Sequence, residues 1–142
     1  MKTGVIDLLA LLLSAQARPE AERLVYYARL QVEIAKQMDA TLVQDLSKAH
    51  TVREFAERFC LSESSIKNYF CGVYGQSIQQ YVTQQQMDCA AKLLCSTRLP
   101  VITVANRVGY ENQSKFSAAL RRKFGVSPRE YRRGSLVLPN TP

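Results

Sequence analysis

The side chains of residues 112–123 are of the kinds that hydrogen-bond to nucleic acids. Amide, hydroxyl and ammonium groups come first, on Asn112, Gln113, Ser114, Lys115 and Ser117. Three consecutive cations follow, Arg121, Arg122 and Lys123. Amides, hydroxyls and lysines pair with base edges in a groove of duplex DNA, and arginines and lysines bind its phosphates. The stretch therefore has the chemistry to contact both parts of a duplex.

Two short helices must position these groups. Apolar residues at helical spacing predict the first helix before Gly109, at Val101, Val104, Ala105 and Val108. The same spacing predicts the second helix before Gly125, at Phe116, Ala119, Leu120 and Phe124. Two short helices joined by a turn that contains glycine, with polar groups on the second, are typical of a helix-turn-helix unit that binds DNA. We therefore predict such a unit at 101–125.

Positive charge is concentrated at the C-terminal end of the 142-residue chain. Residues 98–142 hold nine cations and two acids, whereas residues 1–97 hold ten of each, so the last third accounts for the whole net charge of +7. A basic surface attracts a polyanion, because each phosphate that it neutralises releases counterions. The alternative is a solvated surface that keeps the protein in solution. With 46% hydrophobic and 22% charged residues, the composition is that of a globular protein.

The four cysteines and the single histidine form no recognisable metal or catalytic pattern. No C-x-x-C pair occurs among Cys60, Cys71, Cys89 and Cys95, and zinc ligands normally come as close pairs. We predict reduced, mostly buried thiols in a cytosolic protein. No catalytic residue, metal or cofactor is expected, and an enzyme would have to rely on His50 with one of these thiols.

Residues 1–45 are predicted to form docking or linking helices. Val5 and four leucines fit the stripe of an amphipathic helix, Leu8, Leu9, Leu12 and Leu13. Asp7 interrupts the apolar run, which argues against a secretory signal, and no run is long enough to span a bilayer. Pro19 is placed to start a second helix, from about Glu20 to Leu46, that covers the core. The four leucines are candidates for contact with a second copy of the chain, as a homodimer, or with another domain.

Another helix-turn-helix pattern lies earlier in the chain, at 51–75. It is called the first copy, and the unit at 101–125 is called the second copy. Thr51 and Glu54 form a capping box, and Ser62 caps a helix that carries Ser64, Ser65, Lys67 and Asn68. Its apolar positions and its glycine stop coincide with those of the later copy. In this alignment Ile66, Phe70, Tyr74, Gly75 and Ser77 match Phe116, Leu120, Phe124, Gly125 and Ser127. Two copies in register are hard to explain by core packing alone.

One long linker helix is predicted between the two copies, because residues 77–96 contain neither glycine nor proline. Leu99 and Pro100 end this helix and begin the basic copy. The tail, residues 134–142, has two prolines, no charge and no periodicity, so we expect it to be disordered.

Residues 46–133 resemble the DNA-binding domain of the AraC/XylS family of bacterial transcription regulators. The most specific signature lies in the second copy, at Ile102, Ala105, Val108-Gly109-Tyr110, Ser114, Phe116, Phe124-Gly125, Ser127-Pro128 and Tyr131-Arg132. The resemblance implies an all-α fold of seven helices, in which two homeodomain-like three-helix units are joined by the linker helix. It also implies double-stranded DNA and RNA polymerase as partners of a cytoplasmic, nucleoid-associated protein.

The resemblance also assigns contacts to individual residues. Base contacts would come from Ser64, Ser65, Lys67 and Asn68 in the first copy, and from Gln113, Ser114, Lys115 and Ser117 in the second. Phosphate contacts would come from the helix caps at Ser62 and Asn112 and from Arg121, Arg122 and Lys123. The chain departs from the family at Gln86, Asn68 and Ala118, where relatives often have arginine. Ala118 can offer a base only a methyl contact.

The sequence thus predicts a transcription regulator with two recognition helices in adjacent segments of the major groove. Its regions would be N-terminal helices at 1–45, a DNA-binding domain at 46–133 and a tail at 134–142. The alternative is a basic helical adaptor that binds an acidic protein or an RNA without reading a duplex sequence.

Overall fold

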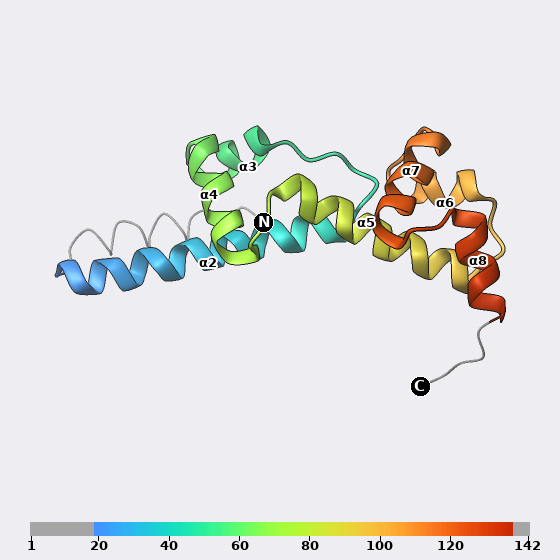
Figure 1. The fold of residues 1–142 in the computed structure, drawn as a ribbon. Helices are drawn as coiled ribbons and strands as arrows, with labels where there is room; N and C mark the ends of the chain where they lie inside the picture. The colour runs from blue at the N-terminus through green and yellow to red at the C-terminus, as the bar shows by residue number, and fades with distance from the viewer. Residues whose placement is uncertain (1–18, 138–142) are drawn as a thin grey trace. The chain divides into compact units, whose positions relative to one another are not determined.

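The computed structural model describes residues 19–137, with side chains up to residue 134. This part of the chain contains seven α-helices and no strand, which confirms the predicted all-α class. The helices are α2 (Glu20–Gln44), α3 (Val52–Phe59), α4 (Glu63–Tyr74), α5 (Ile78–Ser96), α6 (Val101–Arg107), α7 (Gln113–Phe124) and α8 (Pro128–Val137) (Figure 1). They form two compact units, and the division falls within α5, after Tyr81. The leucines at residues 8–13 and the end of the predicted tail lie outside the described residues.

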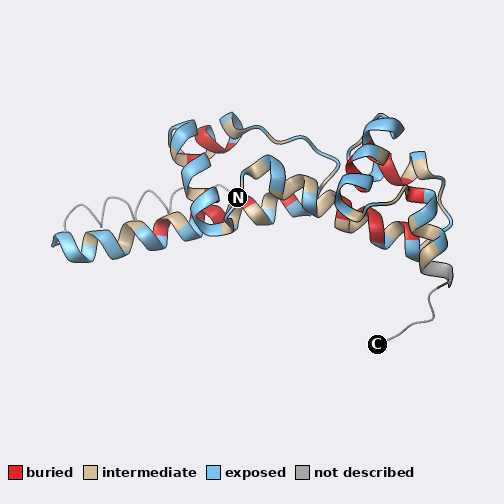
Figure 2. Cartoon of the chain, in the orientation of Figure 1, coloured by how far each residue is buried: buried red, intermediate tan, exposed pale blue. Residues whose placement is uncertain are grey.

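The first unit is built from α2, α3, α4 and the start of α5. α2 packs along α4, and their facing apolar side chains are buried together with those of α3: Leu30, Ile34, Met38, Leu42, Phe55, Phe59, Ile66 and Phe70. The N-terminal half of α2 differs from the prediction, since Leu24, Val25 and Val32 are exposed rather than part of the core. The described helices cover α2 only from Leu30 onward (Figure 2).

Side-chain caps fix the starts of both helices in the first copy. Thr51 Oγ1 accepts a hydrogen bond from the backbone amide of Glu54 at 3.1 Å. Ser62 Oγ accepts one from the amide of Ser65 at 3.1 Å and donates to the Ser65 hydroxyl at 2.9 Å. These bonds satisfy amides that the first turn of a helix leaves without an intrahelical partner. The two predicted caps are therefore confirmed.

Three aromatic rings of the first unit pack against one another, and one of them is hydrogen-bonded to a carboxylate. The ring centroids of Phe70, Tyr74 and Tyr81 lie 4.7 to 5.2 Å apart. The Tyr81 hydroxyl donates a hydrogen bond to the Asp39 carboxylate on α2. Burial raises the pKa of Tyr81 far above its ordinary value, and the hydrogen bond to Asp39 raises it further. A neutral phenol thus ties the start of α5 to α2.

The second unit combines α6, α7 and α8 with the remainder of α5 (Figure 1). Its core consists of apolar residues from α5, α6 and α7: Met87, Ala90, Leu94, Val104, Ala105, Val108, Phe116, Ala119 and Leu120. Partly buried side chains surround this core, among them Tyr110, Phe124 and Tyr131. The two helices of the basic copy therefore pack on the linker helix.

The segment Asp45–Ala49 also belongs to the second unit, although it connects α2 to α3 in the sequence. The Leu46 carbonyl accepts a hydrogen bond from Gln86 Nε2 at 3.1 Å. Gly109 has a φ of +94°, and a Cβ atom there would lie only 2.8 Å from the same carbonyl oxygen. Glycine is required here for two reasons, the positive φ and the close backbone approach.

The two copies share geometry as well as sequence pattern. Ile66 and Phe116, which the repeat aligns, are both fully buried. Ser77 and Gln80 exchange two amide to side-chain hydrogen bonds at 3.2 Å, and Ser127 and Glu130 do the same at 3.0 and 3.2 Å. An aromatic pair follows in each copy, Tyr74 with Tyr81 at 5.1 Å and Phe124 with Tyr131 at 4.9 Å. The internal repeat predicted from the sequence is thereby confirmed.

Helix α8 continues past the predicted boundary at 133, to Val137. A single glycine at 134 weakens a helix without ending it. Arg132 has a structural role, because its guanidinium donates to the Leu94 carbonyl at 3.1 Å and to the Leu99 carbonyl at 2.6 Å. It thus satisfies a carbonyl of the last turn of α5, which no amide of that helix can reach.

The cysteines differ from the prediction of mostly buried thiols. Cys60, Cys71 and Cys95 are exposed, and Cys89 is half-buried. Cys60 occupies a left-handed position at the end of α3, with a φ of 55°. Among residues 19–137, none of the helices combines the length and apolarity that a bilayer-spanning segment requires.

Candidate nucleic-acid interface

Helix α7 presents one apolar and one polar face. Phe116 and Leu120 are fully buried in the core of the second unit. At the start of the helix, Asn112 Oδ1 accepts hydrogen bonds from the amides of Ser114 at 2.8 Å and Lys115 at 3.1 Å. The core contacts and this cap fix the rotation of α7, and hence which of its side chains face the solvent. Asn112, a predicted phosphate contact, uses its side-chain oxygen in the cap.

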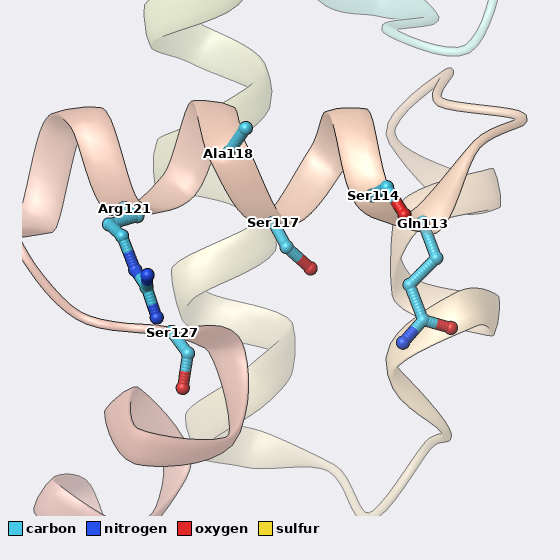
Figure 3. A pocket seen from close by; sticks show the side chains of 6 residues that line it. All are labelled: Gln113, Ser114, Ser117, Ala118, Arg121 and Ser127. Atoms are coloured by element: carbon cyan, nitrogen blue, oxygen red, sulfur yellow. The ribbon is translucent and has the colours of Figure 1, made fainter.

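The polar face of α7 lines an open hollow of about 680 Å³ (Figure 3). Its walls are Gln113, Ser114, Ser117, Ala118, Arg121 and Ser127. Figure 3 shows the side chains of Gln113, Ser117 and Arg121 projecting to the same side of the helix. The hollow thus combines an amide, three hydroxyls and a guanidinium, which are donors and acceptors suited to base edges and phosphates.

Lys115 and Arg122 are exposed but do not line this hollow. They are seven residues apart, so that at 3.6 residues per turn they share one side of α7. From the sequence, Lys115 was predicted to contact bases together with Gln113, Ser114 and Ser117. The structure separates Lys115 from these three residues and places Arg121 with them instead.

Lys123 is tied to the linker helix. Its ammonium group donates to Asp88 Oδ1 at 2.5 Å and to the Gln84 carbonyl at 3.2 Å, both on α5. Only 26% of its side chain is exposed. The Asp88 carboxylate already balances the charge of the Lys123 ammonium. Lys123 is therefore less available than Arg122 to bind a phosphate.

A carboxylate also lies near Arg121. The backbone amide of Ser127 donates to Glu130, and this hydrogen bond holds the pKa of Glu130 below its ordinary value. The charges of Arg121 and Arg133 lower that pKa further. Glu130 is therefore ionised at neutral pH, where it caps α8 and offsets part of the charge of Arg121.

Helix α4 presents the corresponding face in the first unit. Ser64, Lys67 and Asn68 are exposed, as a recognition surface requires. Ser62 and Ser65, two further predicted contacts, are hydrogen-bonded to each other in the cap. The repeat aligns Cys71 with Arg121, so this face carries a thiol where α7 carries a guanidinium.

Comparison with known proteins places this arrangement in a family. Residues 55–134 match the family described as "Helix-turn-helix domain". The arabinose operon regulatory protein of Escherichia coli is 34% identical over 83 residues, which are 58% of this chain and 28% of that protein. The chain belongs to the AraC family. It spans about a third of the length of the curated relatives that it matches, which are transcriptional regulators.

Two solved AraC-type structures resemble the chain over most of their length. The C-terminal domain of AraT, a response regulator from Geobacillus stearothermophilus, is 32% identical with a TM-score of 0.69, covering 77% of this chain and 91% of that domain. The DNA-binding domain of AdpA, solved in complex with a target DNA, is 25% identical with a TM-score of 0.66, covering 70% of this chain and 90% of that domain.

Ser127 and Asp88 were not predicted from the sequence to lie at the interface of this AraC-family chain. Ser127 lines the hollow because α8 begins beside the end of α7. The internal repeat aligns Ser127 with Ser77, and this repetition was the signal in the sequence that singled out the position. The Lys123 to Asp88 ion pair joins residues far apart in sequence, and periodicity within one helix carries no information about such a contact.

Proposed function

We propose that the chain binds double-stranded DNA sequence-specifically and regulates transcription. The observation that carries this proposal is the hollow on α7, whose amide, hydroxyl and guanidinium groups project from a helix fixed by its core and its cap. The DNA complex of the AdpA domain supports it, because that domain shares the fold over 70% of this chain. Helix α7 would enter the major groove and α4 an adjacent segment of it.

The proposed roles follow from where the side chains lie. Gln113, Ser114 and Ser117 contact base edges, and Arg121 extends this surface with a guanidinium that can pair with a guanine or a phosphate. Lys115 and Arg122, on the flank of α7, bind backbone phosphates. On α4, a smaller surface of Ser64, Lys67 and Asn68 makes further contacts with the duplex and adjusts how the chain fits on it.

The two recognition helices are proposed to contribute unequally. α7 carries Lys115, Arg121, Arg122 and Lys123, whereas α4 carries Lys67 together with the acid Glu63. Each phosphate contact adds affinity that depends on salt and not on sequence. The second unit would therefore supply most of the attraction to DNA.

The family of the chain extends this proposal to partners and location. We propose RNA polymerase as a partner, a place on the nucleoid in the cytoplasm, and no catalysis by the chain itself. The predicted homodimer through Leu8, Leu9, Leu12 and Leu13 remains a proposal, since these residues lie outside the described range.

Selection from a pool of random DNA duplexes tests the proposed function. We expect a recovered site that is preferred over random duplex by at least about a thousandfold at physiological salt. An asymmetric site about two helical turns long would mean that both α4 and α7 read bases, and a site of one turn would leave base reading to α7. Salt-sensitive binding without any preference would overturn the proposal in favour of a basic adaptor.

Three alanine variants of α7 separate the proposed roles. Gln113→Ala should lower affinity for the selected site by about 10- to 100-fold and relax preference at one base pair. Arg122→Ala should weaken all duplexes alike and reduce the slope of log affinity against log salt by about 1. Lys123→Ala should change this slope less, because its ammonium already pairs with Asp88. Fluorescence anisotropy titrations at several salt concentrations measure both quantities, and equal nonspecific losses in all three variants would contradict the assignment.

A further inference from the structure

The N-terminal half of α2 exposes an apolar stripe with no described partner. Leu24, Val25 and Val32 are 67%, 52% and 38% exposed. Ala21 and Ala28 are exposed as well, and the series 21, 25, 28, 32 follows the spacing of one helix face. Figure 2 shows this half of α2 mostly pale blue, with buried residues gathered farther along the helix. A stripe of this kind normally packs against another apolar surface.

The stripe lies on the N-terminal half of α2, and it faces away from Leu30, the first residue of α2 that the first unit buries. Leu30, which is buried there, lies two residues from both Ala28 and Val32, and two residues correspond to about 200° around a helix. Ala35, which is also buried, lies seven residues after Ala28 and shares its side of α2, so the described helices cover this side only beyond the stripe. Among the described residues, the stripe itself stays exposed.

We propose that the stripe is covered by the leucine-rich segment of the same chain, residues 5–13, folded back antiparallel along α2. The sequence of this segment predicts an amphipathic helix with Leu8, Leu9, Leu12 and Leu13 on its apolar face. Its acid, Asp7, falls on the opposite face. Only Ala17, Arg18 and Pro19 separate the end of such a helix from α2, and connections of this length join antiparallel helices.

The register of the pair follows from the length of the connection. In an antiparallel pair joined by a short turn, residues at equal distances from the turn lie opposite each other. With Arg18 at the centre of the turn, Leu12 lies opposite Leu24 and Leu8 lies opposite Ala28. Val5 reaches the level of Val32, where the stripe ends. The apolar residues of the segment therefore match the stripe in both position and length.

A contact within one chain is favoured over a second copy by mass action. A segment joined by a three-residue connection has an effective concentration in the millimolar range or above, which a separate molecule must exceed to compete. In this arrangement the leucines are satisfied within the chain, and dimerisation through them requires the pair to open. Because the later half of α2 builds the core of the first unit, the pair becomes a rigid extension of that unit.

Disulfide trapping in the full-length chain tests the proposal. In a background with Cys60, Cys71 and Cys95 changed to serine and Cys89 to alanine, we introduce Leu12→Cys with Leu24→Cys. The control pairs Leu12→Cys with Arg23→Cys, which is at the same level of α2 but on its other side. We expect an intrachain disulfide in the first variant and little in the control, by non-reducing electrophoresis. A cross-linked dimer would identify a second copy as the occupant, and no cross-link in either variant would also overturn the proposal.

Hydrogen exchange keeps the test independent of the cysteine-substituted background. In the otherwise unchanged chain, Leu9→Asp with Leu12→Asp should speed amide exchange in residues 21–29 by at least about tenfold, because the stripe loses its cover. Exchange in the first-unit core around Ile34 and Met38 should stay unchanged. Unaltered exchange in residues 21–29 would contradict the proposed contact.

Discussion

Replacing Phe116 with alanine should unfold the second unit in a large part of the molecules and leave the first unit folded. Phe116 is fully buried among apolar residues of α5, α6 and α7. Truncation of a buried phenylalanine costs about 3–5 kcal/mol, which is a large share of the stability of a small domain. Phe70, on α4 of the first unit, is equally buried, although the repeat aligns it with Leu120. Phe70→Ala should therefore have the converse effect.

Hydrogen exchange measured by mass spectrometry distinguishes the two units. In Phe116→Ala, protection should fall in α6 and α7 and persist in α2 and α4, and Phe70→Ala should reverse this pattern. Ile102→Ala is a control within α6, because this residue is 38% exposed and its truncation should cost less than about 1 kcal/mol. Equal loss of protection in both units for either phenylalanine variant would mean that they unfold as one cooperative body.

The internal repeat explains why so much of the fold followed from the sequence. Each copy places a capping side chain, apolar positions at helical spacing and a glycine within one short segment, and these are local signals. The ends of α4 at Glu63 and Tyr74 and of α7 at Gln113 and Phe124 were therefore predictable. Local propensity and tertiary packing agree in these segments, which is typical of a well-specified fold.

The predictions of burial were wrong where one sequence pattern is compatible with either a buried or an exposed position. The apolar residues of α2 have the same periodicity whether they face the core or another segment, so the whole helix was predicted to cover the core, although Leu24 and Val25 are exposed. Small apolar residues such as Cys71 also fit either a core or a surface. Sequence pattern gives the faces of a helix, and only the packed structure shows which face is covered.

The candidate interface was predictable in its composition and not in its internal arrangement. The basic and polar character of residues 112–123 is visible in the sequence. The rotation of α7 depends on how Phe116 and Leu120 enter the core, and this rotation decides that Ser117, and not Lys115, lines the hollow. The pairing of Lys123 with Asp88 depends on the packing of α7 against α5. Both properties arise from contacts between helices.

Gly109→Ala should destabilise the second unit by about 3 kcal/mol. The positive φ of 94° costs a non-glycine residue about 1–2 kcal/mol. The new Cβ would also lie 2.8 Å from the Leu46 carbonyl oxygen and 3.1 Å from Gln86 Nε2, the two atoms that form a hydrogen bond. The segment Asp45–Ala49 would have to move, and loss of this bond adds about 1 kcal/mol.

Gly125→Ala is the matched control for Gly109→Ala. Gly125 has a similar φ of +79°, but nothing lies within 4 Å of the position that its Cβ would take. This control should lose only the conformational cost of the positive φ, about 1–2 kcal/mol. Denaturant midpoints at an unchanged slope give both free energies of unfolding. Equal losses in the two variants would show that the approach to Leu46 contributes nothing.

A double-mutant cycle tests how much of the stability lost in Gly109→Ala comes from the hydrogen bond between Gln86 and the Leu46 carbonyl. Gln86→Ala alone should cost about 1 kcal/mol, because it removes the donor to the Leu46 carbonyl. In the Gly109→Ala background the same change should cost less, since the segment has already moved away from Gln86. Such coupling would show that the glycine in the turn of the basic helix-turn-helix holds the Asp45–Ala49 segment in place. Additive losses would instead assign the effect of Gly109→Ala to backbone strain within the turn.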